Sequence, residues 1–149
     1  VVRTDALVEY QMFPRLLALA ERAWHQARWE LPLTEGQKFS AESSFVDQQA
    51  LAEDWAGFAA ALGRKELLKL DRAGVGYRIP VPGAALQGDE RATAMPYPGL
   101  ALEYFDGGRW LPVADSVPVS ATALRARSAD GERAGREVPL NPAHSVSTR

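Results

Sequence analysis

One pair of neighbouring carboxylates in the sequence could do acid–base chemistry, within Gly88-Asp89-Glu90. Two adjacent carboxylates can act as an acid and its helper, provided that burial perturbs the pKa of at least one of them. This pair, however, stands between two short candidate strands, where Gly-Asp is typical of a hairpin turn. Because a hairpin tip is solvated, we interpret Asp89 and Glu90 as turn residues and not as a catalytic pair.

The sequence lacks the motifs of other catalytic and cofactor sites. It has no cysteine and no HExxH-type spacing, so its two histidines, His25 and His144, have no companion ligands for zinc. No serine lies in a Gly-x-Ser-x-Gly elbow, and Gly74-Val75-Gly76 lacks the third glycine and the following helix of a phosphate-binding loop. We therefore predict that the chain carries no catalytic residue, no cofactor and no metal.

Aromatic residues of the second half are the remaining candidates for contact with a ligand. An exposed row of rings could stack on sugars, and four rings form a cluster in the sequence: Tyr97, Tyr104, Phe105 and Trp110. Aromatic side chains on strands are more often packed on alternate faces. Core packing is therefore favoured, and a sugar platform is kept as the alternative.

We also interpret the large side chains of the first half as structural. Trp24, Trp29 and Trp55 are expected to pack against neighbouring helices. Arg15 and Glu21 could pair across their helix or cap neighbouring carbonyls, and a structural ion pair is favoured over a catalytic role.

Helical periodicity governs the first thirty residues. Residues 4–30 predict a short helix that starts at Thr4 or Asp5 and, after the interruption at Pro14, a longer helix. The longer helix, over residues 13–27, has one apolar stripe, formed by Phe13, Leu17, Ala20, Trp24 and Ala27.

Two further helices are predicted before the pattern changes. Residues 31–40 read as a loop, after which Ser43 or Ser44 is expected to cap a strongly amphipathic helix that ends at Gly63. A short third helix over residues 65–72 is expected to stop at Gly74.

Beyond Gly74 the apolar residues recur at every second position, over 77–81, 100–105 and 123–127. Turn dipeptides such as Pro98-Gly99 and Asp130-Gly131 separate these runs. Short strands with frequent turns indicate a small antiparallel sandwich. Because so short a stretch builds little core of its own, the sandwich is expected to lean on the preceding helices.

Composition narrows the class of protein. The chain has 149 residues, 46% of them hydrophobic, and a net charge of −2, which gives no support for binding of nucleic acid. No uncharged run approaches the ~20 apolar residues of a membrane span. The chain begins with Val1 and has no leader-like stretch, so we expect it to be part of a longer sequence.

Several motifs together resemble a known family. Residues 1–30, with Phe13-Pro14-Arg15 and Glu21-Arg22-Ala23-Trp24, resemble the end of the catalytic barrel of bacterial beta-N-acetylhexosaminidases of the chitobiase type, family-20 glycoside hydrolases. Later segments resemble the C-terminal immunoglobulin-like domain of those enzymes. These segments are Leu70 to Val75, Tyr77 to Ala84, Pro98 to Leu100, Asp106 to Trp110, and Ser128 to Gly131 with Arg133 and Arg136.

The resemblance implies an α+β fold in which the last helix of a TIM-type barrel and linker helices precede a small immunoglobulin-like sandwich. It implies four parts: the barrel end at 1–30, a helical linker at 31–74, the sandwich at 75–140 and a loose tail at 141–149. The family's catalytic Asp-Glu pair and sugar-binding residues precede Val1, so none is carried over, and Asp89-Glu90 matches that pair only in its letters.

The resemblance also implies a parent enzyme that removes terminal N-acetylhexosamines from oligosaccharides such as chitobiose, with retention and substrate assistance, in the periplasm or outside the cell. This chain would be a non-catalytic structural part, and the stripe of helix 13–27 would meet the missing barrel or a second copy. A carbohydrate-binding or adhesive sandwich is the alternative, and a free-standing helical regulator is a remote third reading.

Overall fold

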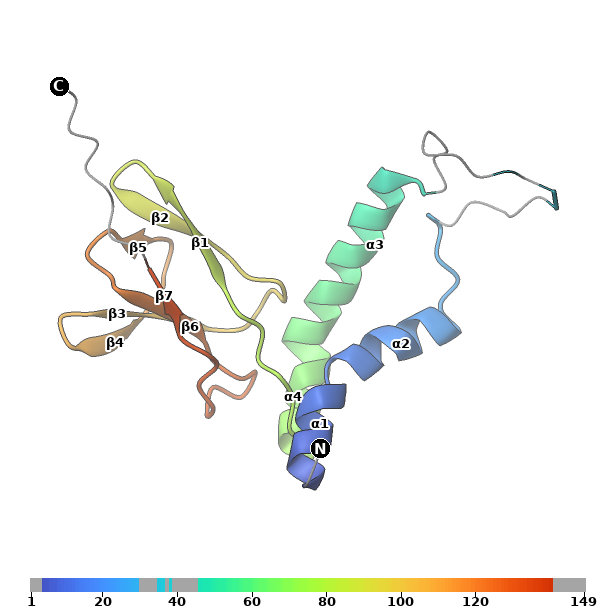
Figure 1. The fold of residues 1–149 in the computed structure, drawn as a ribbon, viewed down its shortest axis with the longest axis horizontal. Coiled ribbons are helices and arrows are strands. Elements are labelled where there is room, and N and C mark those ends of the chain that lie inside the picture. Colours follow the sequence, from blue (N-terminus) through green and yellow to red (C-terminus); the bar gives the residue numbers. More distant parts are fainter. Residues whose placement is uncertain (1–3, 30–34, 37, 39–45, 141–149) are drawn as a thin grey trace.

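The computed structural model describes residues 4–29, 35, 36, 38 and 46–140, with helices first and a sandwich of strands after them (Figure 1). The helical part consists of α1 (Asp5–Met12), α2 (Arg15–Trp24), α3 (Gln48–Ala61), the π-helical turn η1 (Leu62–Glu66) and α4 (Leu67–Arg72). The strands are β1 (Gly83–Gln87), β2 (Glu90–Ala94), β3 (Leu102–Asp106), β4 (Arg109–Pro112), β5 (Val117–Pro118), β6 (Ala123–Ala126) and β7 (Val138–Pro139). The predicted α+β fold is confirmed.

The first two helices are separated at Pro14, as predicted. Thr4 caps α1 by accepting the N–H of Leu7 on its hydroxyl oxygen, and Phe13 ends that helix in an extended conformation. Helix α2 stops at Trp24, three residues before the end predicted for helix 13–27, because His25 takes an extended backbone. Ala27 is nevertheless buried.

The next helix, α3, begins later than predicted. Its N-cap is Asp47, whose carboxylate accepts the N–H groups of Gln49 and Ala50. Ser43 and Ser44, the predicted caps, lie outside the described residues, as do most of the predicted loop 31–40 and the tail 141–149.

Gly63 does not end the helix, and that prediction is wrong. The chain continues through η1 into α4, and Gly63 is buried there against the loop before β3. A Cβ at this position would lie 2.2 Å from the carbonyl oxygen of Pro98. The residue is therefore a glycine because of close packing, and not because a helix ends.

The predicted stop at Gly74 is confirmed. Gly74 takes a φ of +69° and donates its N–H to the carbonyl of Asp71, while Val75 donates to the carbonyl of Leu70. These two bonds form a Schellman motif, which satisfies carbonyls that the end of a helix leaves free.

Two antiparallel sheets make up the sandwich, with strand orders β1-β2-β5 and β4-β3-β6-β7. The strands predicted over 100–105 and 123–127 correspond to β3 and β6, which pair directly, with Tyr104 opposite Leu124. The structure places Gly88 and Asp89 in the turn between β1 and β2, as the hairpin interpretation requires.

The strand predicted over 77–81 is wrong. Residues 75–82 form no ladder, and their backbone instead bonds to the first helices: Gly76 donates to the Glu9 carboxylate, and Arg78 donates to the Phe13 carbonyl. Pro80 has no N–H to offer a sheet. The predicted alternation holds over its first three residues, since Tyr77 and Ile79 are buried and Arg78 is exposed, but it fails at Val81, which is 39% exposed.

Two apolar clusters hold the molecule together. The junction core contains Leu67 of α4 together with Tyr77, Ile79, Leu100 and Ala126, so the helices and the sandwich share it. The sandwich core contains Val117, Ala121 and Leu124. The prediction that the sandwich leans on the helices is therefore confirmed. Among the described residues, no helix has the length and apolarity needed to span a bilayer.

Candidate functional site

The strongest polar arrangement at the junction is a network of Asp71, Tyr77 and Arg133, which we call the junction network. The Asp71 carboxylate accepts the Tyr77 hydroxyl at 2.9 Å and a guanidinium N–H of Arg133 at 2.7 Å. It also accepts the N–H of Asp130 at 3.1 Å, and its side chain is only 1% exposed. One buried carboxylate thus joins α4, the segment after Gly74 and the loop that follows β6.

Tyr77 lies at the centre of this network. Its hydroxyl donates to Asp71 and accepts the N–H of Ala129 at 2.8 Å, while the Arg133 guanidinium lies over its ring, 4.6 Å from the centroid. Burial of the side chain raises the pKa of Tyr77 from 10.0 to about 12. The hydroxyl is neutral at physiological pH and joins Asp71 to the backbone of Ala129.

The junction network escaped the sequence analysis, although one signal for it was present. Asp71 lies in the last turn of α4, where the helix dipole disfavours a negative charge. A carboxylate in that position indicates a cationic or hydrogen-bonding partner elsewhere in the chain.

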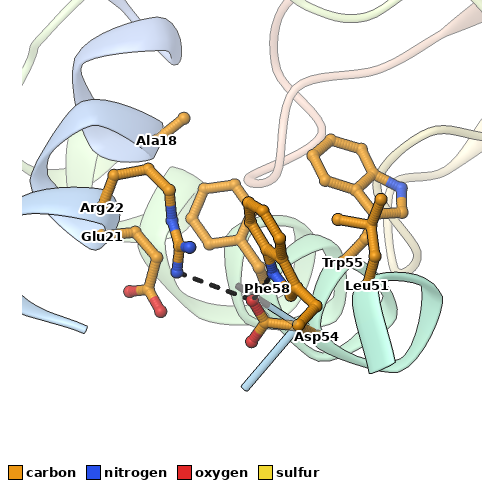
Figure 2. A pocket seen from close by; sticks show the side chains of 8 residues that line it. Ala18, Glu21, Arg22, Leu51, Asp54, Trp55 and Phe58 are labelled. Carbon is orange, nitrogen blue, oxygen red and sulfur yellow. Dashed lines mark hydrogen bonds and ion pairs between the residues drawn. The ribbon is translucent and has the colours of Figure 1, made fainter. Parts of the chain in front are cut away.

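A second polar centre lies between α2 and α3, beside a small cavity of about 130 Å³ (Figure 2). Asp54 of α3 accepts the indole N–H of Trp29 at 2.9 Å and pairs with Arg22 of α2 at 3.5 Å. The Nε2 atom of His25 lies 3.4 Å from the other carboxylate oxygen. Arg22 also lies over the Trp29 ring, 5.3 Å from its centroid.

These contacts revise the predicted ion pair of the first half. Arg22 and Asp54 pair across two helices, whereas the described residues hold no ion pair between Arg15 and Glu21. His25 is held by Asp54, and His144 lies outside the described residues. Within the described part of the chain, no three side chains are grouped in a way that could hold a metal ion.

The packing predicted for the tryptophans is correct for one of the three. Trp29 is half-buried and held by Asp54 and Arg22, as just described. Trp24 is 91% exposed and Trp55 is 51% exposed, although the Trp55 ring lies 5.9 Å from the ring of Phe58 in a tilted pair. The prediction was wrong for Trp24 and Trp55, because α2 and α3 approach each other around open hollows and bury neither ring.

The aromatic residues of the sandwich pack instead of forming a platform. Tyr97 contacts the junction core, and Tyr104 contacts the sandwich core. The rings of Phe105 and Trp110 are inclined to each other by 56°. Arg125 covers one face of Trp110 at 3.8 Å from the centroid, and Glu103 fixes that arginine. A sugar ring would have to displace this arginine to stack on that face.

Asp89 and Glu90 are both exposed at the hairpin between β1 and β2, and neither belongs to the junction network. Neither carboxylate has the burial expected of a catalytic acid–base pair. Within the described part of the chain, polar side chains are instead gathered in the junction network and in the cluster around Asp54.

Comparison with known proteins agrees with the resemblance. Residues 66–137 match the family described as chitobiase/beta-hexosaminidase C-terminal domain. The chain is 42% identical over 139 residues to N,N'-diacetylchitobiase of Vibrio harveyi, a match that covers 91% of the chain and 16% of that protein. It is 38% identical over 150 residues to a beta-hexosaminidase of Vibrio vulnificus, covering 93% of the chain and 18% of that protein.

A third relative matches a shorter region. Beta-hexosaminidase B of Pseudoalteromonas piscicida is 48% identical over 66 residues, which cover 42% of the chain and 8% of that protein. The chain spans less than a fifth of the length of these relatives. The chain belongs to the chitobiase and beta-hexosaminidase family, as the C-terminal region of such an enzyme.

Proposed function

We propose that this chain is the non-catalytic, structural C-terminal part of an enzyme that removes terminal N-acetylhexosamine residues from oligosaccharides such as chitobiose. In this proposal α1 and α2 form the last helix of the catalytic barrel, and the sandwich supports it from outside. The hydrolysis itself, with retention and with assistance from the substrate's acetamido group, takes place on residues that precede Val1.

The observation that carries the proposal is the lack of cover on α1 and α2. Neither helix has a buried residue. The two helices expose large apolar side chains of several kinds, including Leu7, Tyr10, Met12, Leu19 and Trp24. Exposed apolar surface of this extent marks a surface that contacts another structure. The upstream part of a much longer enzyme supplies that structure.

The sandwich supports the proposal from the other side. It shares the junction core with α4, and the Asp71 carboxylate fixes the connection. A shared buried core and a buried carboxylate that accepts three hydrogen bonds give the linker a defined position and allow the sandwich to act as a rigid support.

Steady-state hydrolysis of a chromogenic N-acetylglucosaminide tests the proposal. The full-length enzyme is expected to hydrolyse it, and purified residues 1–149 are expected to show no turnover. Turnover by the isolated chain that is lost on Asp89→Asn or Glu90→Gln would contradict a structural role. Saturable binding of chitin oligomers that is lost on Trp110→Ala would favour a binding module instead.

The family resemblance also leads us to propose a periplasmic or secreted location for the parent enzyme. Fractionation of the source cells, with an antibody against this chain, tests it. Recovery of the protein with the cytoplasmic fraction would contradict this part of the proposal.

A further inference from the structure

The edge strands of the two sheets differ in how well they are protected against pairing with another chain. Among the described strands, the edges are β1 and β5 in one sheet and β4 and β7 in the other. β4 contains Arg109 and Pro112, and a charge or a proline on an edge opposes the addition of a further strand. β5 and β7 are only two residues long, and they contain Pro118 and Pro139. β1 is five residues long and has neither a charge nor a proline.

β1 is also uncovered on both of its faces. All five of its residues are exposed, and within the described part of the chain its backbone pairs only with β2. Leu86 lies directly opposite Arg91 of β2 and therefore shares a face with it. Arg91 is 3% exposed, whereas Leu86 is 52% exposed. An apolar side chain and a row of backbone hydrogen-bonding groups are thus left available to a partner strand.

The order of side chains along β1 fits an antiparallel copy of the same strand. In a two-fold pair centred on Ala85, Ala84 of each copy lies opposite Leu86 of the other, and Gly83 lies opposite Gln87. Each larger side chain therefore meets a small one. Directly opposite side chains of antiparallel strands are close enough to pack on each other.

The distribution of charge favours the same orientation. Asp89 and Glu90 are exposed at the hairpin that follows β1. In an antiparallel pair the two hairpins point in opposite directions, so each lies beside the start of the partner's β1, where Val81 and Pro82 carry no charge. A parallel pair would bring the carboxylates of both hairpins together at one end, where they would repel each other.

We infer that the outer edge of β1 is a contact between two copies of this chain, which pair β1 with β1 in an antiparallel, two-fold arrangement. The pairing joins two three-stranded sheets into one continuous sheet. A pair of five-residue strands is smaller than the interface of about 1,200 Å² that a stable complex buries, so the dimer is weak and forms at high protein concentration.

The first test measures dimer formation of the 149-residue chain by sedimentation equilibrium at up to about 1 mM. All variants carry Trp24→Lys, which interrupts the apolar surface of α1 and α2. Ala85→Lys places two like charges directly opposite each other and is expected to weaken the dimer about fivefold, as is Ala85→Glu. An equimolar mixture of the two variants is expected to recover the dimer, because opposite charges then face each other.

A matched control is Ala94→Lys, at an exposed position of β2 that is not on the outer edge of the sheet. It is expected to leave the dimer unchanged. Because Ala85 and Ala94 are both exposed, neither substitution should unfold the chain, and circular dichroism checks this for every variant.

A disulfide trap tests the register of the pair. The chain has no cysteine, so Ala85→Cys introduces a single thiol. Directly opposite residues of antiparallel strands have Cα atoms about 4.5–5.5 Å apart, which a disulfide can span. Mild oxidation is expected to convert Ala85→Cys mostly into a covalent dimer. Gly83→Cys is expected to give little covalent dimer, because its opposite residue is Gln87.

Four results would overturn the inference. The first is a Trp24→Lys chain that remains monomeric at about 1 mM. The second is a mixture of Ala85→Lys and Ala85→Glu that stays as dissociated as each variant alone. Equal cross-linking of Ala85→Cys and Gly83→Cys is the third, since it would reveal random collision. The fourth is slow amide hydrogen exchange of β1 in the full-length enzyme at every protein concentration, because another part of the same polypeptide would then cover the edge.

Discussion

The helical part and the sandwich of this chain differ in how far their apolar side chains are buried. Among the described residues, eight of the large exposed hydrophobic side chains belong to residues 4–72, and three belong to the rest. Helices α1 and α2 bury nothing, whereas the sandwich encloses Val117, Ala121 and Leu124 in a core of its own. The sandwich therefore has a core of its own, whereas α1 and α2 leave most of their large apolar side chains exposed.

Helix α4 is the exception within the helical part. Leu67 is fully buried in the junction core, and Asp71 is bonded to the sandwich. By its packing, α4 belongs with the strands, so the comparison is between α1 to α3 on one side and α4 with the sandwich on the other. The predictions below test where that division lies.

The largest effect is expected for Asp71→Ala. The change leaves the Tyr77 hydroxyl and the Asp130 N–H without an acceptor and removes the ion pair of Arg133, so the free energy of unfolding should fall by about 3 kcal/mol. Urea unfolding followed by circular dichroism measures it.

The matched control is Asp89→Ala, in the exposed turn between β1 and β2, which should change stability by less than about 0.5 kcal/mol. Equal effects of the two substitutions would show that the junction network contributes nothing. Two separate unfolding transitions in the wild-type chain would contradict a shared junction core.

A smaller effect is expected for Gly63→Ala. Its new methyl group would meet the carbonyl oxygen of Pro98 at 2.2 Å, so the helix or the loop must shift, at a cost of about 2 kcal/mol. Gly57→Ala lies in α3 with nothing within 4 Å, and there the substitution should stabilise the chain by about 0.5–1 kcal/mol. A lower Tm for Gly63→Ala together with a higher Tm for Gly57→Ala would establish that Gly63 contacts the loop before β3. Stabilisation by both would contradict that contact.

A weaker effect on stability is expected at alkaline pH, where Tyr77 ionises. The pKa of Tyr77 is raised to about 12 in the folded chain from an ordinary value of 10.0, so the unfolded chain loses this proton first as the pH rises. The stability that Tyr77 contributes is complete below pH 10 and is lost between pH 10 and 12. At pH 11 the loss should be about 1 kcal/mol. Urea unfolding at pH 9 and 11 should show a smaller decrease for Tyr77→Phe than for the wild type.

The smallest effect on stability is expected for Trp24→Lys. Trp24 is 91% exposed, so the free energy of unfolding should change by less than about 0.5 kcal/mol. Light scattering should nevertheless show weaker self-association of the isolated chain, because the lysine interrupts the uncovered apolar surface. A wild-type chain that stays monomeric at high concentration would contradict the view that α1 and α2 need to be covered.

Local signals predicted much of the fold. Pro14 separates two helices and Gly74 ends another because the backbone limits of proline and glycine act wherever those residues stand. The strands β3 and β6 followed from alternation over four or five residues. Alternation over 77–81 did not give a strand. An extended segment packed against a helix can also bury every second side chain without pairing in a sheet.

What depended on distant contacts could not be predicted. Gly63 read as a helix stop because nothing nearby in the sequence shows that the Pro98 carbonyl lies against it. Asp71 and Arg133 are 62 residues apart, so no local pattern predicts their ion pair. The one local signal is that a carboxylate stands in the last turn of a helix, where the helix dipole disfavours it. Trp24 was expected to be packed because its spacing shows an apolar stripe but not whether a partner for that stripe is present.

The junction core also bears on how such a domain can be inherited. A chain divided at Gly74 would leave Tyr77 and Ile79 without Leu67 and would separate Asp71 from its cation. The region shared with the family begins at residue 66, one position before α4. The unit that can be transferred is therefore α4 together with the sandwich. A fusion of this domain to another enzyme would have to include Glu66 and the residues that follow it.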